Sequence, residues 1–185
     1  FLLFNSNDKE YQSLHQEMIK YLRFLRDHAR ETDIRSGLLE QWFTFREVKQ
    51  NHLGYSRRNN DGRGLGNDFA DALHNSLYTI FSNFGTEEIT RASHLEKLCL
   101  VTRGVGKDKI SDFTTNLIKK FLLEYTQDFA KKYIDPKRRK IINVDHVKFN
   151  YLTKTWDNSE FDIPYHPDNY VILTPRNLLH NYHQM

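Results

Sequence analysis

Two aspartates and a serine follow a pair of glycines in the middle of the chain, in the segment GVGKDKISD. Asp108 and Asp112 are four positions apart, a spacing that places both carboxylates on one face of a helix, where they can share a hard divalent cation. A helix amino end with a glycine turn before it also attracts phosphate, and Lys107 and Ser111 would add donors there. We therefore expect Asp108 and Asp112 to hold Mg²⁺ beside a phosphate group.

The same residues also have a purely structural interpretation. Lys107 and Lys109 flank the aspartates and can neutralise them as ion pairs, while Ser111 or Asp112 can cap a first helical turn by accepting from its free N–H groups. In that case Asp108 is an ordinary surface carboxylate. Both interpretations stay open at the level of the sequence.

A second acidic and basic pair, Glu47 and Lys49, falls in an alternating aromatic run that favours a strand. Residues two apart in a strand project to the same side. A carboxylate there would bind a divalent cation, and the ammonium would steady the attacking water or the scissile phosphate. With Asp33 upstream, the pattern resembles the D…E-x-K signature of the PD-(D/E)XK nuclease superfamily. An ordinary ion pair on a surface strand is the alternative.

Between these two groups lies a basic, glycine-rich stretch, GYSRRNNDGRGLG. It contributes candidate phosphate-binding residues of two kinds, the arginines Arg57, Arg58 and Arg63 and the glycines Gly62, Gly64 and Gly66. Backbone donors and positive charge coincide there, as contacts to nucleic-acid phosphates require. The stretch matches neither G-x-x-x-x-G-K-[ST] nor G-x-G-x-x-G, so an ordinary nucleotide-binding fold is not expected. A hairpin-like loop without a ligand is the alternative.

Composition excludes several classes of site. Cys99 is the only cysteine, which rules out an internal disulfide and a cysteine-based zinc site within one chain, and the nine histidines form no zinc-ligand pattern. No apolar run approaches the length of a membrane span, so we expect a cytoplasmic protein without membrane contact. The net charge of +3 is too small to indicate nucleic-acid binding by itself. We interpret the KRRK run at 137–140 first as a solvated turn, with phosphate contact as the alternative.

The elements that must position these residues are mostly helical. Apolar residues recurring at steps of three and four predict helices over 7–30, 67–85, 93–101 and 112–134, with a last helical turn at 176–179. Alternation predicts strands over 42–49 and 144–152, a turn over 153–161 and a short buried strand over 170–173. We expect an α+β fold, mainly helical, with a small mixed sheet completed by the carboxyl-terminal third. Residues 1–185 should form a single domain of a longer chain whose amino-terminal portion is missing.

Several segments together resemble a group of bacterial proteins that carry a central GxGxDxISDxT segment and an LP…LLxP ending. The matching segments here are FREVKQNHLGYS, GRGLG, HLEKLCL, GVGKDKISDFTTNLIKKFL and IPYHPDNYVILTPRNLL. The group is associated with mobile genetic islands and phage defence. No reaction is established for it, so the resemblance implies a defence role and a function for Asp108, Ser111 and Asp112, without a mechanism.

Two hypotheses of function follow. The first is a metal-dependent nuclease or phosphodiesterase that acts in bacterial defence against phage or mobile DNA, with Glu47, Lys49, Asp108 and Asp112 as catalytic residues. The alternative is a non-catalytic subunit that binds nucleic acid or assembles with a protein partner or a second copy of itself in a defence complex.

Overall fold

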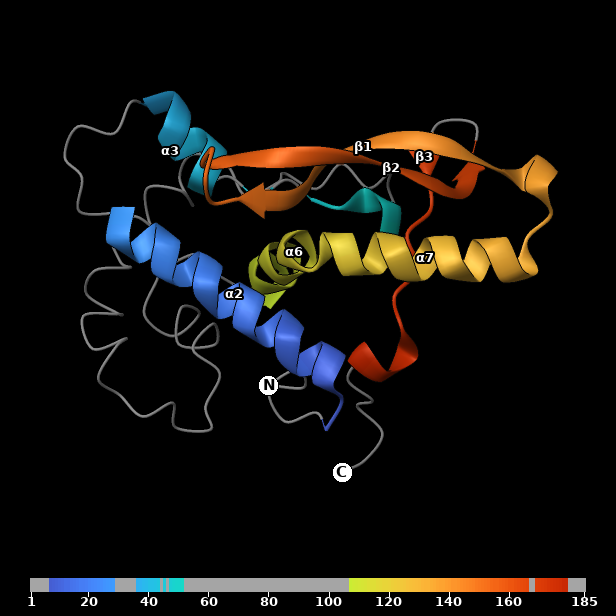
Figure 1. Ribbon diagram of the computed structural model, residues 1–185, viewed down its shortest axis with the longest axis horizontal. Coiled ribbons are helices and arrows are strands. Elements are labelled where there is room, and N and C mark those ends of the chain that lie inside the picture. Colours follow the sequence, from blue (N-terminus) through green and yellow to red (C-terminus); the bar gives the residue numbers. More distant parts are fainter. Residues whose placement is uncertain are drawn as a thin grey trace. The chain divides into compact units, whose positions relative to one another are not determined.

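The computed structural model describes residues 7–28, 36–43, 45, 47–51, 107–166 and 169–179, with only the backbone of 26, 36, 38–40 and 107–110. Its α-helices are α2 (Lys9–His28), α3 (Ser36–Phe43), α6 (Lys107–Leu117) and α7 (Lys119–Tyr133), and its strands are β1 (Arg139–Asn150), β2 (Thr155–His166) and β3 (Asn169–Tyr170). Three short 3₁₀ turns are η1 (Lys49–Asn51), η2 (Pro136–Arg138) and η3 (Arg176–Leu178) (Figure 1). The predicted α+β class is confirmed. The predicted helices over 67–85 and 93–101 lie outside the described residues.

The chain divides into two compact units. Unit 1 combines residues 1–47 with 62–115, and unit 2 combines residues 48–61 with 116–185. The expectation of a single domain stays a prediction. Among the helices that the structure describes, none is both long and apolar enough to cross a membrane.

Aromatic rings form the core of the described part of unit 1. Phe24 of α2 packs edge-on against Trp42 of α3 with ring centroids 5.1 Å apart, and the Tyr21 hydroxyl donates to the Trp42 carbonyl at 2.8 Å. Phe45 lies edge-on to Tyr21 at 6.1 Å and to Phe113 of α6 at 4.4 Å. This chain of rings joins three helices and fixes the position of α6, on which the predicted acidic residues lie.

Unit 2 is built on a long antiparallel hairpin. β1 and β2 have 12 residues each, and their register runs from Arg139 opposite Pro164 to Asn150 opposite Thr155. β3 pairs antiparallel with the other side of β2. The predicted turn over 153–161 is wrong beyond residue 154, because residues from Thr155 onward pair with β1 on both sides of a bulge. Every strand pair within the described residues is antiparallel.

A bulge interrupts β1 where it passes the start of α7. Pairing stops after Val144 and resumes at Lys148, so that between these paired positions β1 has more residues than β2. Within the bulge His146 has a φ of 53°, a left-handed conformation that non-glycine residues adopt rarely. Its N–H donates to the Asn158 side chain at 3.2 Å. The bulge therefore turns the backbone of Asp145 out of the ladder.

Two polar side chains of α7 attach the helix to β2 and to the segment that follows β3. The buried Thr126 hydroxyl donates to the Leu122 carbonyl at 2.6 Å and accepts from the N–H of Leu173 at 2.8 Å. The Gln127 side chain accepts from the N–H of Asp162 at 2.9 Å. Because β3 is short, this N–H has no strand beside it, and the helix supplies the missing acceptor.

The predicted single helix over 112–134 is in fact two helices. Ile118 separates α6 from α7 with φ −97° and ψ 10°, in the bridge region of backbone conformation. Because α6 begins at Lys107, Ser111 and Asp112 lie in its second turn, and the predicted capping role for them is wrong. The predicted helix over 7–30 and the last helical turn near 176–179 are confirmed with slightly shorter bounds.

Candidate functional site

Asp108 and Asp112 both belong to α6. Their spacing of four residues therefore places them on one face of a continuous helix, as the metal hypothesis requires. Asp112 is half-buried and Ser111 is exposed, while the side chains of Lys107 and Asp108 lie outside the described residues. The contribution of these two side chains stays a prediction.

Glu47 and Lys49 do not lie on a strand. α3 runs to Phe43, Glu47 and Val48 are in irregular backbone, and Lys49 begins the 3₁₀ turn η1. The predicted strand over 42–49 is wrong at both ends, because Trp42 and Phe43 close α3 and Lys49 begins η1; between them Phe45 forms an isolated β-bridge. Trp42 and Phe43 are both buried, as consecutive residues at a helix end can be. The prediction that Glu47 and Lys49 project to the same side of a strand is therefore also wrong.

Glu47 has one property that an ordinary surface carboxylate lacks. Its Oε2 atom is buried and has no hydrogen-bond partner among the described residues. A buried carboxylate oxygen without a partner is costly, and a bound cation is one way to satisfy it. Glu47 and Asp112 belong to the same unit, where the ring contact between Phe45 and Phe113 brings their two segments together.

No group of three or more histidine, cysteine, aspartate or glutamate side chains suited to a metal ion occurs in the part of the chain that the structure describes. That search did not include Asp108, whose side chain is not described. The Mg²⁺ expectation therefore stays a prediction. The predicted phosphate-binding loop also lies outside the described residues, with Arg57, Arg58, Arg63, Gly62, Gly64 and Gly66.

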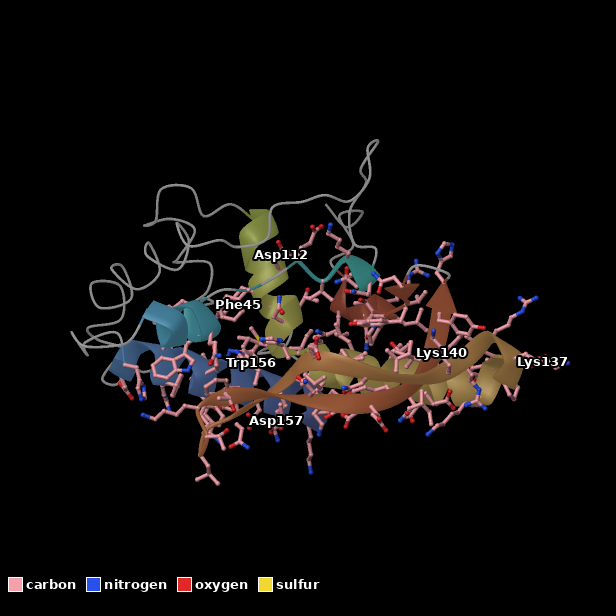
Figure 2. All side chains as sticks on the ribbon, turned by 90° about the horizontal axis from the view of Figure 1, so that it is seen from above. Phe45, Asp112, Lys137, Lys140, Trp156 and Asp157 are labelled. Carbon is pink, nitrogen blue, oxygen red and sulfur yellow. The ribbon has the colours of Figure 1, made fainter. Side chains whose placement is uncertain are left out.

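The described residues contain a basic and aromatic surface that the sequence only hinted at. It gathers where α7 ends, η2 turns and β1 begins, next to the end of β2. Figure 2 shows Lys137 and Lys140 toward this end of the hairpin, and Trp156 and Asp157 toward the other. We call this surface the basic end of unit 2; it consists of the exposed side chains of Lys131, Lys132, Tyr133, Lys137, Arg138, Lys140 and Tyr165.

Two tyrosines of the basic end are exposed and carry a lysine ammonium over the ring. Tyr133 is 63% exposed, with the Nζ of Lys132 5.0 Å from its ring centroid. Tyr165 is 41% exposed, with the Nζ of Lys140 4.6 Å from its centroid. Such contacts stabilise by about 0.5–1 kcal/mol at exposed sites, so they orient the rings without hiding them. Flat aromatic faces and cations are thus presented together to the solvent.

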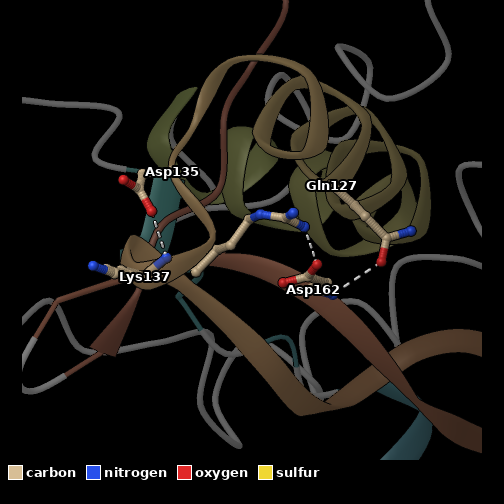
Figure 3. A network of polar contacts seen from close by, with 5 residues as sticks. Gln127, Asp135, Lys137 and Asp162 are labelled. Atoms are coloured by element: carbon tan, nitrogen blue, oxygen red, sulfur yellow. Dashed lines mark hydrogen bonds and ion pairs between the residues drawn. The ribbon is translucent and has the colours of Figure 1, made fainter.

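The neighbouring acidic residues are already engaged (Figure 3). The Asp135 carboxylate accepts from the backbone N–H of Lys137 at 2.8 Å, which closes the turn η2. Asp162 pairs with the Arg139 guanidinium, and its N–H donates to Gln127. No ion pair with a described residue is recorded for the side chains of Lys137 and Arg138. Their charges therefore face the solvent.

A structural reason accounts for some of these charges but not for all. Lys131 and Lys132 lie in the last turn of α7, where cations interact favourably with the helix dipole. Lys137 and Lys140 lie beyond the helix, in η2 and β1, and gain little from that field. The helix dipole therefore does not account for the charges of these two lysines.

At the other end of α7, a buried lysine meets the bulge. The Nζ of Lys119 donates to the carbonyl oxygen of Asp145 at 2.7 Å. Burial lowers the pKa of Lys119 to about 8, although the Asp145 carboxylate opposes this shift. Burial, with the same carboxylate, raises the pKa of Tyr170 to about 12. Strongly perturbed groups occur at functional sites and in structural networks alike. Here the hydrogen bond to the bulge favours the structural role.

Of the sequence signals, the KRRK run comes closest to the basic end. Its four residues separate in the structure: Lys137 and Arg138 are exposed in η2, Arg139 pairs with Asp162, and Lys140 lies over Tyr165. The solvated-turn interpretation is correct only for its first half. Nothing in the sequence pairs the run with Tyr165, because that contact depends on the register of the hairpin.

The sequence matches the family described as a domain of unknown function (DUF8370) over residues 1–185. No curated protein and no solved structure gives a match. What the chain does has to be inferred from its own residues.

Proposed function

Because the chain belongs to the DUF8370 family, whose description assigns no activity, we propose a function from its geometry: it binds nucleic acid through the basic end of unit 2. The observation that carries the proposal is the pair of exposed tyrosines, each overlain by a lysine, beside the exposed Lys137 and Arg138, which form no ion pair with a described residue. Cations contact phosphates, and exposed rings stack on unpaired bases. A single strand, whose bases are accessible, fits this combination best.

The proposal corresponds to the non-catalytic alternative of the sequence hypotheses. The setting we propose is the cytoplasm of a bacterium, in defence against phage or mobile DNA, which the resemblance of the GVGKDKISD segment supports. The arginines of the glycine-rich stretch, Arg57, Arg58 and Arg63, stay candidate phosphate-binding residues in this proposal.

Removing the Tyr133 ring tests the stacking part of the proposal. We expect Tyr133→Ala to weaken binding of a fluorescein-labelled single-stranded oligonucleotide by about 1–3 kcal/mol, the range for loss of one stacked base. Tyr133→Phe keeps the ring and should bind within about twofold of the wild type. Fluorescence anisotropy at one fixed salt concentration measures both.

The matched control is Tyr125→Ala, since Tyr125 is an exposed tyrosine on the same helix two turns earlier, away from the basic end. Equal binding by the wild type and Tyr133→Ala would contradict stacking at this position. Loss of binding in Tyr133→Phe would show that the ring face is not what the ligand uses.

A metal-dependent phosphodiesterase is the second candidate, and the unpartnered Oε2 of Glu47 is the observation that favours it. In this proposal Glu47, Asp108 and Asp112, all of unit 1, hold Mg²⁺. The ion would polarise the phosphate and activate water.

Titration of Mn²⁺ by calorimetry tests the second candidate. Asp112→Asn and Glu47→Gln should each lower the affinity about tenfold or more, because each removes one anionic ligand worth about 1.5–3 kcal/mol. Glu17→Gln, an exposed glutamate of α2, is the control. If both variants bind Mn²⁺ and cleave DNA and RNA as the wild type does, these carboxylates hold no catalytic metal.

A further inference from the structure

No described strand pairs with the outer edge of β1. Among the described strands the sheet order is β1-β2-β3, so β1 lies at the edge of this sheet. Val171 donates to the Pro164 carbonyl at 3.0 Å, which means that the backbone groups of Pro164 face β3. Because these groups alternate sides along an antiparallel strand, those of Ile163 face β1. Lys140 pairs with Ile163 and Ile142 pairs with Phe161, so the backbone groups of Lys140 and Ile142 face β2.

Arg139, Ile141 and Asn143 therefore direct their N–H and C=O groups away from β2. No backbone hydrogen bond at these outward positions is recorded with any described residue. The Ile141 side chain is 71% exposed, although large β-branched side chains in strands normally pack against a neighbour. Backbone groups without a partner among the described residues and an exposed isoleucine thus coincide on a regular stretch that ends at the bulge.

We propose that this edge, residues 139–144, pairs with the same edge of a second copy of the chain, antiparallel and with its two-fold axis at Ile141. In this register the outward residues Arg139 and Asn143 face each other across the axis, and Ile141 faces its own copy. Antiparallel pairing of the three outward residues forms about six backbone hydrogen bonds. It also covers both exposed isoleucines, since cross-strand apolar side chains lie in contact.

The edge is complementary to itself in this register and not in the neighbouring ones. Lys140 faces Ile142 of the second copy, so that no like charges stand directly opposite. Shifting the axis to Lys140 would place two lysines opposite each other, which is destabilising. Shifting the axis to Ile142 would require Asp145 to pair with Arg139 of the second copy. The carbonyl of Asp145 already accepts from Lys119, and its backbone leaves the ladder. These restrictions favour a second copy over a strand of unrelated sequence.

A disulfide across the axis tests the register directly. Directly opposite, hydrogen-bonded residues have Cα atoms about 5.5 Å apart, within the range that a disulfide spans. In a Cys99→Ser background, Ile141→Cys should therefore form a covalent dimer on mild oxidation, seen on a non-reducing gel. Leu152→Cys, at a position 96% exposed in the hairpin turn and off the edge, should stay monomeric at the same protein concentration. Absence of the dimer in Ile141→Cys would overturn the proposed register.

The mass in solution tests the dimer itself. Sedimentation velocity of the wild type should give a species of about twice the 22.2 kDa chain mass at high concentration. Ile141→Lys should give 22.2 kDa at every concentration, with a circular dichroism spectrum like that of the wild type. The control Leu152→Lys makes the same chemical change off the edge and should keep the dimer. A wild type that is monomeric throughout, or a dimer that persists in Ile141→Lys, would overturn the proposal.

Discussion

Replacing Lys137 and Arg138 together by alanine should weaken binding of a single-stranded oligonucleotide about tenfold near physiological salt. Each phosphate contact releases condensed counterions and contributes about 0.7 to the slope of log K against log salt for single strands. Loss of two contacts should therefore reduce the magnitude of that slope by about 1.4. Anisotropy titrations at several salt concentrations give both quantities from the same protein.

A second double variant separates this effect from a general change of charge. Arg23→Ala with Lys148→Ala removes two exposed cations outside the basic end, one on α2 and one on β1. It lowers the net charge equally, and its salt slope should stay that of the wild type. If the two double variants have the same slope, the basic end makes no specific phosphate contact.

Local periodicity was sufficient to predict α2 and the helical residues after Asp112, but not α3 or the break between α6 and α7. Apolar residues recur on both sides of Ile118, so the pattern continues through a residue whose ψ is 10°. A single residue with non-helical backbone angles ends one helix and precedes the next without changing which residues are apolar. For the same reason periodicity did not predict that the helix begins at Lys107, which places Ser111 inside it.

β2 could not be predicted because its stability comes from its partner. Asp157, Ser159 and Glu160 are polar and suggest a turn, yet each belongs to the ladder with β1. A strand that pairs along its whole length and faces solvent on one side has little need of apolar residues there. The alternating residues of β1 were recognisable from the sequence; those of β2 follow from the hairpin.

The candidate sites also differ in whether the sequence alone could reveal them. The acidic pair of α6 was found from its spacing, because four residues on a helix share a face in any context. The basic end was missed because Tyr133 and Tyr165 come from separate elements that only the fold brings to one surface. Glu47 drew attention for a strand geometry that it lacks, and its unpartnered oxygen depends on burial that the sequence does not reveal.

The free energy of unfolding should rise by up to about 3 kcal/mol as the pH increases from 8 toward 10, because of Lys119. The pKa of Lys119 is lowered to about 8 in the folded chain, from the ordinary lysine value of 10.5. Between these two values the unfolded chain holds a proton that the folded chain has released, so a higher pH favours the folded state. Urea unfolding followed by circular dichroism at successive pH values measures the rise.

The adjacent lysine provides the control for this effect. Lys119→Met should remove the rise, whereas Lys120→Met, which lacks only an exposed lysine paired with Glu124, should keep it. Above pH 10 stability should fall again in both variants, because the pKa of Tyr170 is raised to about 12 and unfolding then releases its proton. Parallel profiles for the two variants would mean that Lys119 is solvated in the folded protein. In that case its bond to Asp145 would not hold the bulge against α7.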